Sequence, residues 1–198
     1  MIVWINGAFG SGKTQTAHAL HRRIPGSYVY DPERAGYFIR RNMPKALAQG
    51  DFQDFPMWRS INASMLRYLD ANHDGPIIVP MTIVNPVYWR EVVGQLCEEG
   101  IDVRHFTLCA SEAVLRKRLK SRGEGGSSWA AHQIERCVAG LADETFRVHL
   151  DTDRTTIADN VERIAAGADL VLAPDNRGPF RAAVDRLATQ IKHIRFRP

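Results

Sequence analysis

A short apolar run, residues 2–5, leads directly into a glycine-rich segment, and this order constrains the fold more than any other feature of the chain. The segment has the pattern G-x-x-x-x-G-K-T, and residues 14–23 after it have the pattern of a helix. In such a strand–loop–helix unit, backbone N–H groups and the positive end of the helix dipole converge on an anion. The pattern therefore predicts a nucleoside-triphosphate-binding loop made of Gly7, Ala8, Phe9, Gly10, Ser11, Gly12, Lys13 and Thr14.

Two side chains of this loop have distinct expected roles. Lys13 would reach the β- and γ-phosphates, and the Thr14 hydroxyl would hold Mg²⁺. A GTPase is disfavoured because no N-K-x-D motif occurs, and the D-x-x-G sequence at 175–178 comes too late in the chain. ATP and Mg²⁺ are therefore the expected ligands.

Length and composition fit one globular α/β domain spanning residues 1–198. The chain has 44% hydrophobic residues and a net charge of +4. Without a long Lys/Arg run, this mild positive charge favours a phosphate ligand over nucleic acid. The three cysteines, Cys97, Cys109 and Cys137, lack the spacing of a zinc site or a disulfide framework.

The sequence also favours a cytoplasmic protein. Its beginning enters a strand without a basic leader, and its longest apolar stretch, residues 77–84, is interrupted by Pro80 and too short to cross a bilayer. Residues 178–195 predict an amphipathic C-terminal helix with basic flanks. Packing of this helix against the sheet is favoured, and peripheral contact with an anionic membrane is the alternative.

Short apolar strands alternate with amphipathic helices along the chain, which predicts a parallel sheet covered on both faces. The expected strands are 2–6, 28–30, 77–81, 103–108 and 148–150, and the expected helices are 13–23, 86–99, 111–122, about 130–143 and 155–166. Residues 32–74 interrupt the alternation with two helical patterns. We expect this insertion to lie at the carboxyl edge of the sheet, where an acceptor would bind.

Acidic residues follow the second expected strand, and Asp31 is the first candidate for a general base, with Glu33 second. In phosphoryl transfer to an alcohol, a carboxylate accepts or orients the hydroxyl proton. Asp31 would also support the metal ion, because the third strand ends without an acid. The alternative is that Asp31 only caps a helix beginning at Pro32.

A basic stretch near residue 120 precedes a glycine-rich loop, and together they suggest a lid over residues 122–136. Arg118 and Arg122 are expected to repel each other on one helix face unless an anion lies nearby. A triphosphate would relieve that repulsion, and as catalytic residues Arg118 and Arg122 would neutralise charge that develops in the transition state of phosphoryl transfer. Arg136 is a further candidate for the same cluster. Arg118 is also a candidate to stack on the base. The alternative is a solvated basic surface.

The acceptor site is expected to combine aromatic faces with a few polar groups. Trp58 recurs with other apolar residues at helical spacing, so it is expected in the core, and Asn85 before Pro86 is expected to cap a helix. The candidate acceptor residues are Glu33, Tyr37, Phe52, Phe55, Arg59 and Thr82.

Several of these segments together resemble the bacterial tunicamycin-resistance proteins. The segments that carry the resemblance are residues 5–17, 21–23, 28–33 and 51–59; it covers most of the chain and is densest in the first ninety residues. More distantly, residues 106–122 are similar to the lid region of nucleoside-monophosphate-kinase-like enzymes, including shikimate and gluconate kinases. The kinase resemblance implies a five-stranded parallel sheet of order 2-3-1-4-5.

The resemblance to the tunicamycin-resistance proteins implies an ATP-binding protein that protects its host from tunicamycin, a lipid-bearing nucleoside antibiotic. Transfer of the γ-phosphoryl group of ATP to a hydroxyl of the drug is the leading hypothesis. ATP-dependent sequestration of the drug without chemistry and a kinase for an ordinary metabolite are the alternatives.

Overall fold

The computed structural model describes residues 1–175, 177, 178 and 184. Their strands form one parallel sheet in the order β2-β3-β1-β4-β5, which confirms the expected topology. The strands are β1 (Ile2–Gly7), β2 (Tyr28–Val29), β3 (Ile77–Pro80), β4 (Val103–Cys109) and β5 (His149–Asp151). The C-terminal helix expected over 178–195 lies largely outside the described residues.

The helices fall close to the expected ranges. They are α1 (Lys13–Arg23), α2 (Glu33–Asn42), α3 (Pro56–Asn72), α4 (Pro86–Trp89), α5 (Gln95–Glu98), α6 (Glu112–Lys120), α7 (Trp129–His132), α8 (Ile134–Leu141) and α9 (Ile157–Gly167). A π-helical segment, η3 (Arg90–Gly94), joins α4 to α5, so the helix expected over 86–99 is continuous but locally widened. Short 3₁₀ turns are η1 (Lys45–Leu47), η2 (Phe52–Asp54) and η4 (Glu144–Phe146).

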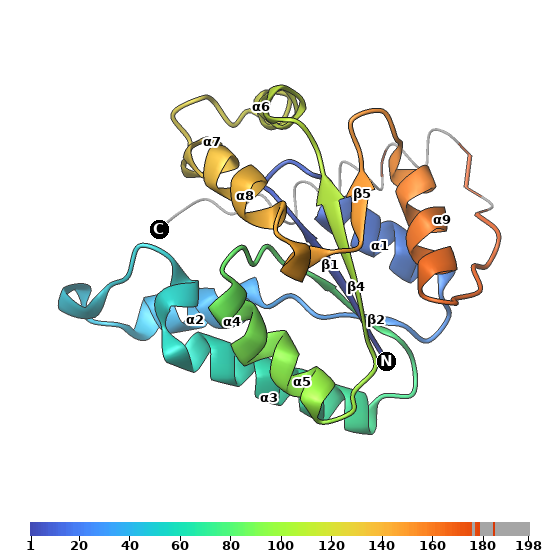
Figure 1. Cartoon of the computed structure of the whole chain (residues 1–198), viewed down its shortest axis with the longest axis horizontal. Helices are drawn as coiled ribbons and strands as arrows, with labels where there is room; N and C mark the ends of the chain where they lie inside the picture. Colours follow the sequence, from blue (N-terminus) through green and yellow to red (C-terminus); the bar gives the residue numbers. More distant parts are fainter. Residues whose placement is uncertain (176, 179–183, 185–198) are drawn as a thin grey trace.

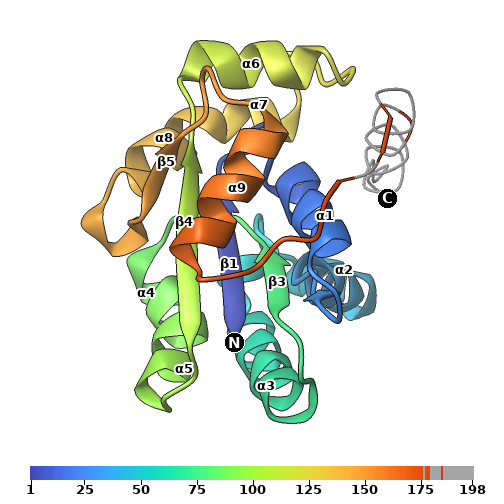
Figure 2. The ribbon, with the colours of Figure 1, turned by 90° about the vertical axis from the view of Figure 1, so that its right-hand side faces the viewer.

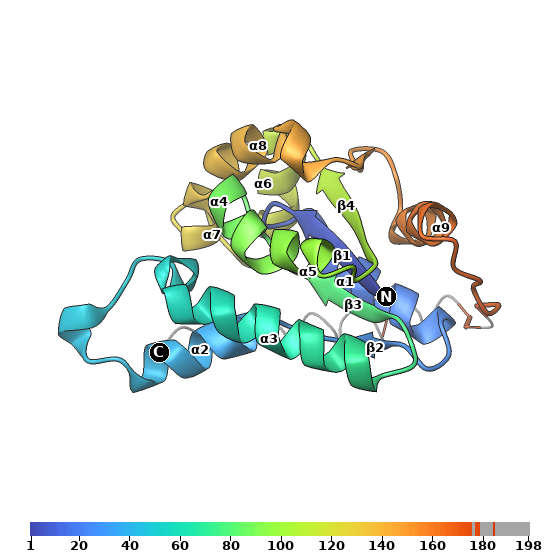
Figure 3. The same cartoon turned by 60° about the horizontal axis from the view of Figure 1, so that its bottom comes forward.

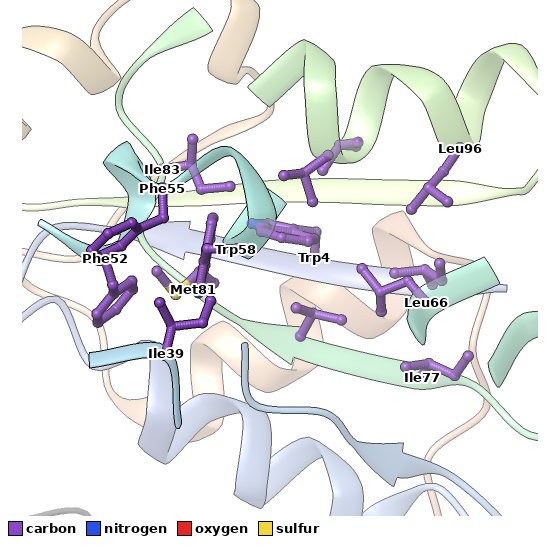
Figure 4. Packing of buried hydrophobic residues seen from close by; sticks show 14 residues of the cluster. Trp4, Ile39, Phe52, Phe55, Trp58, Leu66, Ile77, Met81, Ile83 and Leu96 are labelled. Carbon is purple, nitrogen blue, oxygen red and sulfur yellow. The ribbon is translucent and has the colours of Figure 1, made fainter. Parts of the chain in front are cut away.

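Helices cover both faces of the sheet (Figures 1 and 2). The central strand β1 is therefore buried on both sides, and its side chains alternate between the two faces. Val3 and Ile5 pack with α1 and α9 on one face. Ile2 and Trp4 pack with α3 and α5 on the other face, where Trp58 of α3 is fully buried (Figure 4). The expectation that Trp58 belongs to the core is confirmed.

The insertion between β2 and β3 contains α2 and α3, which lie side by side (Figure 3). The indole N–H of Trp58 donates to the Pro32 carbonyl at 3.0 Å and so ties α3 to the chain just before α2. Tyr30 of the β2 end donates to the Asn62 side chain of α3 at 2.7 Å. The insertion is therefore held against the sheet by buried hydrogen bonds as well as by apolar packing.

A buried histidine in β4 makes the stability of the fold depend on pH. The ring of His105 lies 4.2 Å from that of Trp89, and the Phe146 ring closes the cluster at 6.4 Å. The pKa of His105 is lowered to about 4, mainly by burial and also by the charge of His149, while a hydrogen bond to the backbone of Arg147 opposes the shift. The imidazole is thus neutral in the folded protein at neutral pH.

Acidification is expected to destabilise the protein through this group. Because the folded pKa lies below the unfolded one, the stability is present above about pH 6.5 and is lost as pH falls towards about 4. A shift of this size corresponds to about 3 kcal/mol. Denaturant unfolding at about pH 7.5 and about pH 4.5 should therefore show a larger loss for the wild type than for His105→Gln. Equal losses in the two proteins would contradict the assignment.

Candidate functional site

The glycine-rich loop after β1 adopts backbone angles that favour glycine. Gly7, Gly10 and Gly12 have φ values of 149°, 87° and 99°, and Gly12 is the left-handed residue at the start of α1. A Cβ at Gly7 would stand 2.5 Å from Ser11 Oγ and 2.9 Å from the carbonyl oxygen of Leu108. The loop therefore turns tightly into the helix, as the sequence predicts for a phosphate cradle.

The first residue of the loop is anchored by a side chain of β1 and by one from the segment just after β3. Asn6 Oδ1 accepts from the backbone N–H groups of Gly7 and Ile83, at 2.9 and 3.1 Å, and its amide donates to the Ile83 carbonyl. The Thr82 hydroxyl donates to the Gly7 carbonyl at 2.6 Å. Sequence reasoning missed Asn6, although its position directly before the loop was the available signal.

Thr82 was predicted from the sequence to contact the acceptor, but this hydrogen bond indicates that it supports the loop instead. The side chain is 4% exposed and its hydroxyl serves the loop backbone. Thr82→Val keeps the shape but leaves a buried carbonyl without its donor, so we expect a loss of about 1–3 kcal/mol in the free energy of unfolding. Chemical denaturation would measure this loss, and an unchanged free energy of unfolding would support Thr82 as an acceptor contact instead.

Lys13 is a buried cation at the centre of the site. Its side chain is 7% exposed, and Nζ donates a long hydrogen bond of 3.5 Å to the Ala8 carbonyl and lies 5.1 Å from the Phe9 ring centroid. Burial lowers the pKa of Lys13. Glu33 makes the largest opposing contribution, and Asp31 and Arg122 are also close enough to act on it. Charges from three separate segments therefore act on this ammonium group.

The two acidic residues after β2 make different contacts. Asp31 is 9% exposed, and its Oδ1 accepts from the backbone N–H of Glu33 at 3.1 Å, while Oδ2 lies 3.9 Å from Arg34. Asp31 thus supports the start of α2, which begins one residue later than expected. Glu33 lies half-buried in the first turn of α2, with its Oε2 3.4 Å from the Tyr37 hydroxyl.

The three arginines predicted to form one cluster lie in two places: Arg118 and Arg122 are at the end of α6, and Arg136 is against the insertion. Arg118 donates to the Thr152 carbonyl at 2.6 Å, which ties α6 to the loop after β5. Arg122 lies two residues beyond the end of α6, half-buried, where burial lowers its pKa and the charge of Arg118 adds to this effect, while Glu124 opposes it. Arg136 instead lies 3.5 Å from Asp51 of the insertion.

The loop after β5 also borders the phosphate-binding loop, which sequence reasoning did not foresee. A Cβ on Gly12 would stand 3.1 Å from Ile157 Cδ1, at the start of α9. Thr152 is fully buried, and its hydroxyl donates to the Cys109 carbonyl at the end of β4. Arg118 and the loop after β5 therefore lie together beside the glycine-rich loop.

The predicted acceptor residues on the insertion are mostly engaged by the protein itself. Phe52 and Phe55 are 8% and 6% exposed and belong to the core cluster on the α3 face of the sheet, which Figure 4 shows. Arg59 is 8% exposed, pairs with Glu91 and lies 4.2 Å from the Tyr88 ring centroid. We therefore interpret these three as residues that shape the insertion, and the half-buried Tyr37 and Glu33 remain as candidates for the acceptor site.

Asn85 accepts from the Val87 N–H at 2.9 Å and caps α4, as expected. Within the residues the structure describes, no group of three or more His, Cys, Asp or Glu side chains is arranged to hold a metal ion. Among those same residues, none of the helices combines the length and apolar character needed to cross a bilayer.

A parallel sheet of order 2-3-1-4-5 with this loop after its central strand defines a P-loop kinase-like nucleotide-binding protein. Residues 2–143 match the model of a family described as an AAA domain. The Deinococcus radiodurans tunicamycin resistance protein is 36% identical, with 88% of this chain and 99% of that chain covered and a TM-score of 0.74. The chain belongs to the family of the tunicamycin-resistance proteins within this class.

Two kinases share the fold at lower identity. A Janibacter sugar kinase is 22% identical, with a TM-score of 0.60 and coverage of 86% of this chain and 95% of that chain. A Bacteroides thetaiotaomicron shikimate kinase is 14% identical, with a TM-score of 0.56 and coverage of 86% and 99%. No curated protein sequence is a significant match to the chain.

Proposed function

We propose that this protein transfers the γ-phosphoryl group of ATP to a hydroxyl of tunicamycin or a related nucleoside. The observation that carries the proposal is the buried Lys13 in the tight glycine turn after β1, where the charges of Glu33 and Arg122 both act on its ammonium group. A buried cation, a carboxylate and an arginine are the groups that phosphoryl transfer to an alcohol requires. The 36% identity to the Deinococcus radiodurans tunicamycin resistance protein supports the choice of acceptor.

The nucleotide would bind across the loop between β1 and α1. Backbone N–H groups of residues 7–14 and the Lys13 ammonium would hold the phosphates. Mg²⁺ would neutralise phosphate charge when bound, and the half-buried Thr14 hydroxyl, with support from Asp31, is the group offered to it. Arg118, held beside the loop after β5, would contact the base.

The acceptor hydroxyl would lose its proton to a carboxylate of the insertion. Its oxygen bonds to the γ-phosphorus, the bond from that phosphorus to the β–γ bridging oxygen breaks, and ADP leaves with the electron pair. The hydrogen bond from the Glu33 N–H to Asp31 favours a supporting role for Asp31, so Glu33 becomes the first candidate to receive the proton. Arg122 would neutralise charge that develops on the transferred group.

The test is to incubate the protein with Mg-ATP and tunicamycin and to examine the drug by mass spectrometry. A drug carrying one added phosphoryl group, formed together with ADP, supports the proposal. Drug bound at one equivalent but unmodified after many hours would replace it with ATP-dependent sequestration. If nucleotide binds but the drug is neither bound nor modified, a different small metabolite is the acceptor.

A further inference from the structure

The turn before α3 joins the insertion to the opposite side of the site. Asp51 Oδ1 accepts from the backbone N–H of Gln53 at 3.0 Å, so it caps the η2 turn. Asp51 Oδ2 lies 3.5 Å from Arg136, on α8. Arg136 is the last residue of the expected lid, 122–136; its side chain is 52% exposed and that of Asp51 is 15% exposed. This ion pair links residues 85 positions apart in sequence, across the site.

The same turn is bonded to the phosphate-binding loop through a second, buried route. Gln53 is 8% exposed, and its amide donates to the Thr82 carbonyl at 3.0 Å. Thr82 in turn donates through its hydroxyl to the Gly7 carbonyl. Arg59 of α3 donates to the Gln53 carbonyl and fixes the turn from the other side. A displacement of the turn would therefore disturb the backbone of the loop.

The segment that carries Arg136 also packs on the phosphate-binding loop. The Phe9 ring of the loop contacts Trp129 of α7 edge-on, with centroids 5.0 Å apart. Cys137, next to Arg136, is fully buried in a cluster that also includes Ala8 of the loop. Both α7 and α8 thus rest on the loop that the nucleotide would occupy, while Arg136 reaches over to the insertion.

We propose that Asp51 is a positioning residue that, through Arg136, couples nucleotide binding at the loop to the placement of the acceptor-binding insertion. This inference rests on the proposed function for the identity of the two ligands. An ion pair of this exposure contributes little by itself, which suits a contact that must open and close in every cycle. We expect its loss to change local opening by about two- to fivefold rather than to unfold the chain.

Asp51→Asn and Arg136→Gln test this contact without ligand. Asn keeps the oxygen that caps η2 and removes only the charge. Hydrogen exchange should become about two- to fivefold faster both in residues 51–54 and in α8 in either variant, and no faster in the double variant. Arg136→Lys, which keeps the charge, should restore most of the protection. Arg116→Gln is the matched control, because the Arg116 side chain on α6 is 51% exposed, like that of Arg136, and also lies 3.5 Å from a carboxylate.

The coupling itself is tested by adding a non-hydrolysable ATP analogue with Mg²⁺. Nucleotide should slow exchange in residues 51–54 of the wild type, and this protection should be reduced in Asp51→Asn and Arg136→Gln but not in Arg116→Gln. Equal protection in all four proteins, or additive effects of the two substitutions in the ligand-free chain, overturns the inference. Failure of the wild type to bind nucleotide would refute the proposed function, while the ligand-free measurement still decides whether the two segments are linked.

Discussion

Replacing Glu33 by glutamine is expected to reduce the turnover of phosphoryl transfer by about 10²–10⁴-fold, the usual contribution of a positioned general base. Glutamine preserves the size of the side chain and its oxygen near Tyr37 but cannot accept the proton. Nucleotide affinity, measured by calorimetry, should change little, because the loop itself is untouched. Steady-state kinetics with the acceptor identified by mass spectrometry would give the size of the effect.

Two variants make this result interpretable. Glu98→Gln alters a first-turn glutamate of α5, at the other end of the sheet, and should leave turnover unchanged. Asp31→Asn keeps an oxygen for the Glu33 N–H and should have the smaller effect of the two site variants. Normal turnover in Glu33→Gln with loss of turnover in Asp31→Asn would assign the general-base role to Asp31, the first candidate from the sequence.

Replacing Lys13 by methionine is expected to reduce turnover by at least about 10²–10³-fold, the scale of losing one preorganised electrostatic contact. Nucleotide affinity should fall as well, because the ammonium would neutralise the β- and γ-phosphates. The ligand-free protein, however, should be as stable as the wild type or more stable. Burial lowers the pKa of Lys13, so the folded chain carries this charge at a cost that methionine removes.

Thermal unfolding without ligand and calorimetry with Mg-ATP would separate the two effects of Lys13→Met. Lys45→Met is the control, since Lys45 is an exposed residue of η1 and its loss should leave both measurements unchanged. A strongly destabilised Lys13→Met protein would show that the lysine is structural. Undiminished nucleotide affinity in that variant would remove the loop from the proposed mechanism.

Local patterns were sufficient for most of the fold. Alternating strands and helices placed each element to within a few residues, since hydrophobic periodicity reports which face of an element is buried. The C-terminal end of the expected 111–122 helix was less well placed, because Arg122 lies past the end of α6. The expected helix over about 130–143 is divided at Gln133 into α7 and α8.

Contacts between distant segments were beyond such patterns. Thr82, Phe52 and Arg59 were expected at the acceptor because they lie near the carboxyl edge of the sheet, yet they serve the loop backbone, the core and Glu91. Arg136 was expected among the arginines of the lid and instead meets Asp51. Each of these outcomes depends on a partner 32 or more positions away or on burial in the core, which periodicity does not specify.

By itself the sequence determined that a strand, a glycine turn and a helix would form a phosphate cradle, because the left-handed angles at Gly10 and Gly12 and the apolar strand are local properties. Only the tertiary structure decided which groups surround the cradle. Glu33 follows β2 and Arg122 follows α6, and their charges both act on Lys13 because parallel strands bring their carboxyl ends to one edge. The sequence specifies the chemistry of each side chain, but the packing of the elements decides which side chains lie close together.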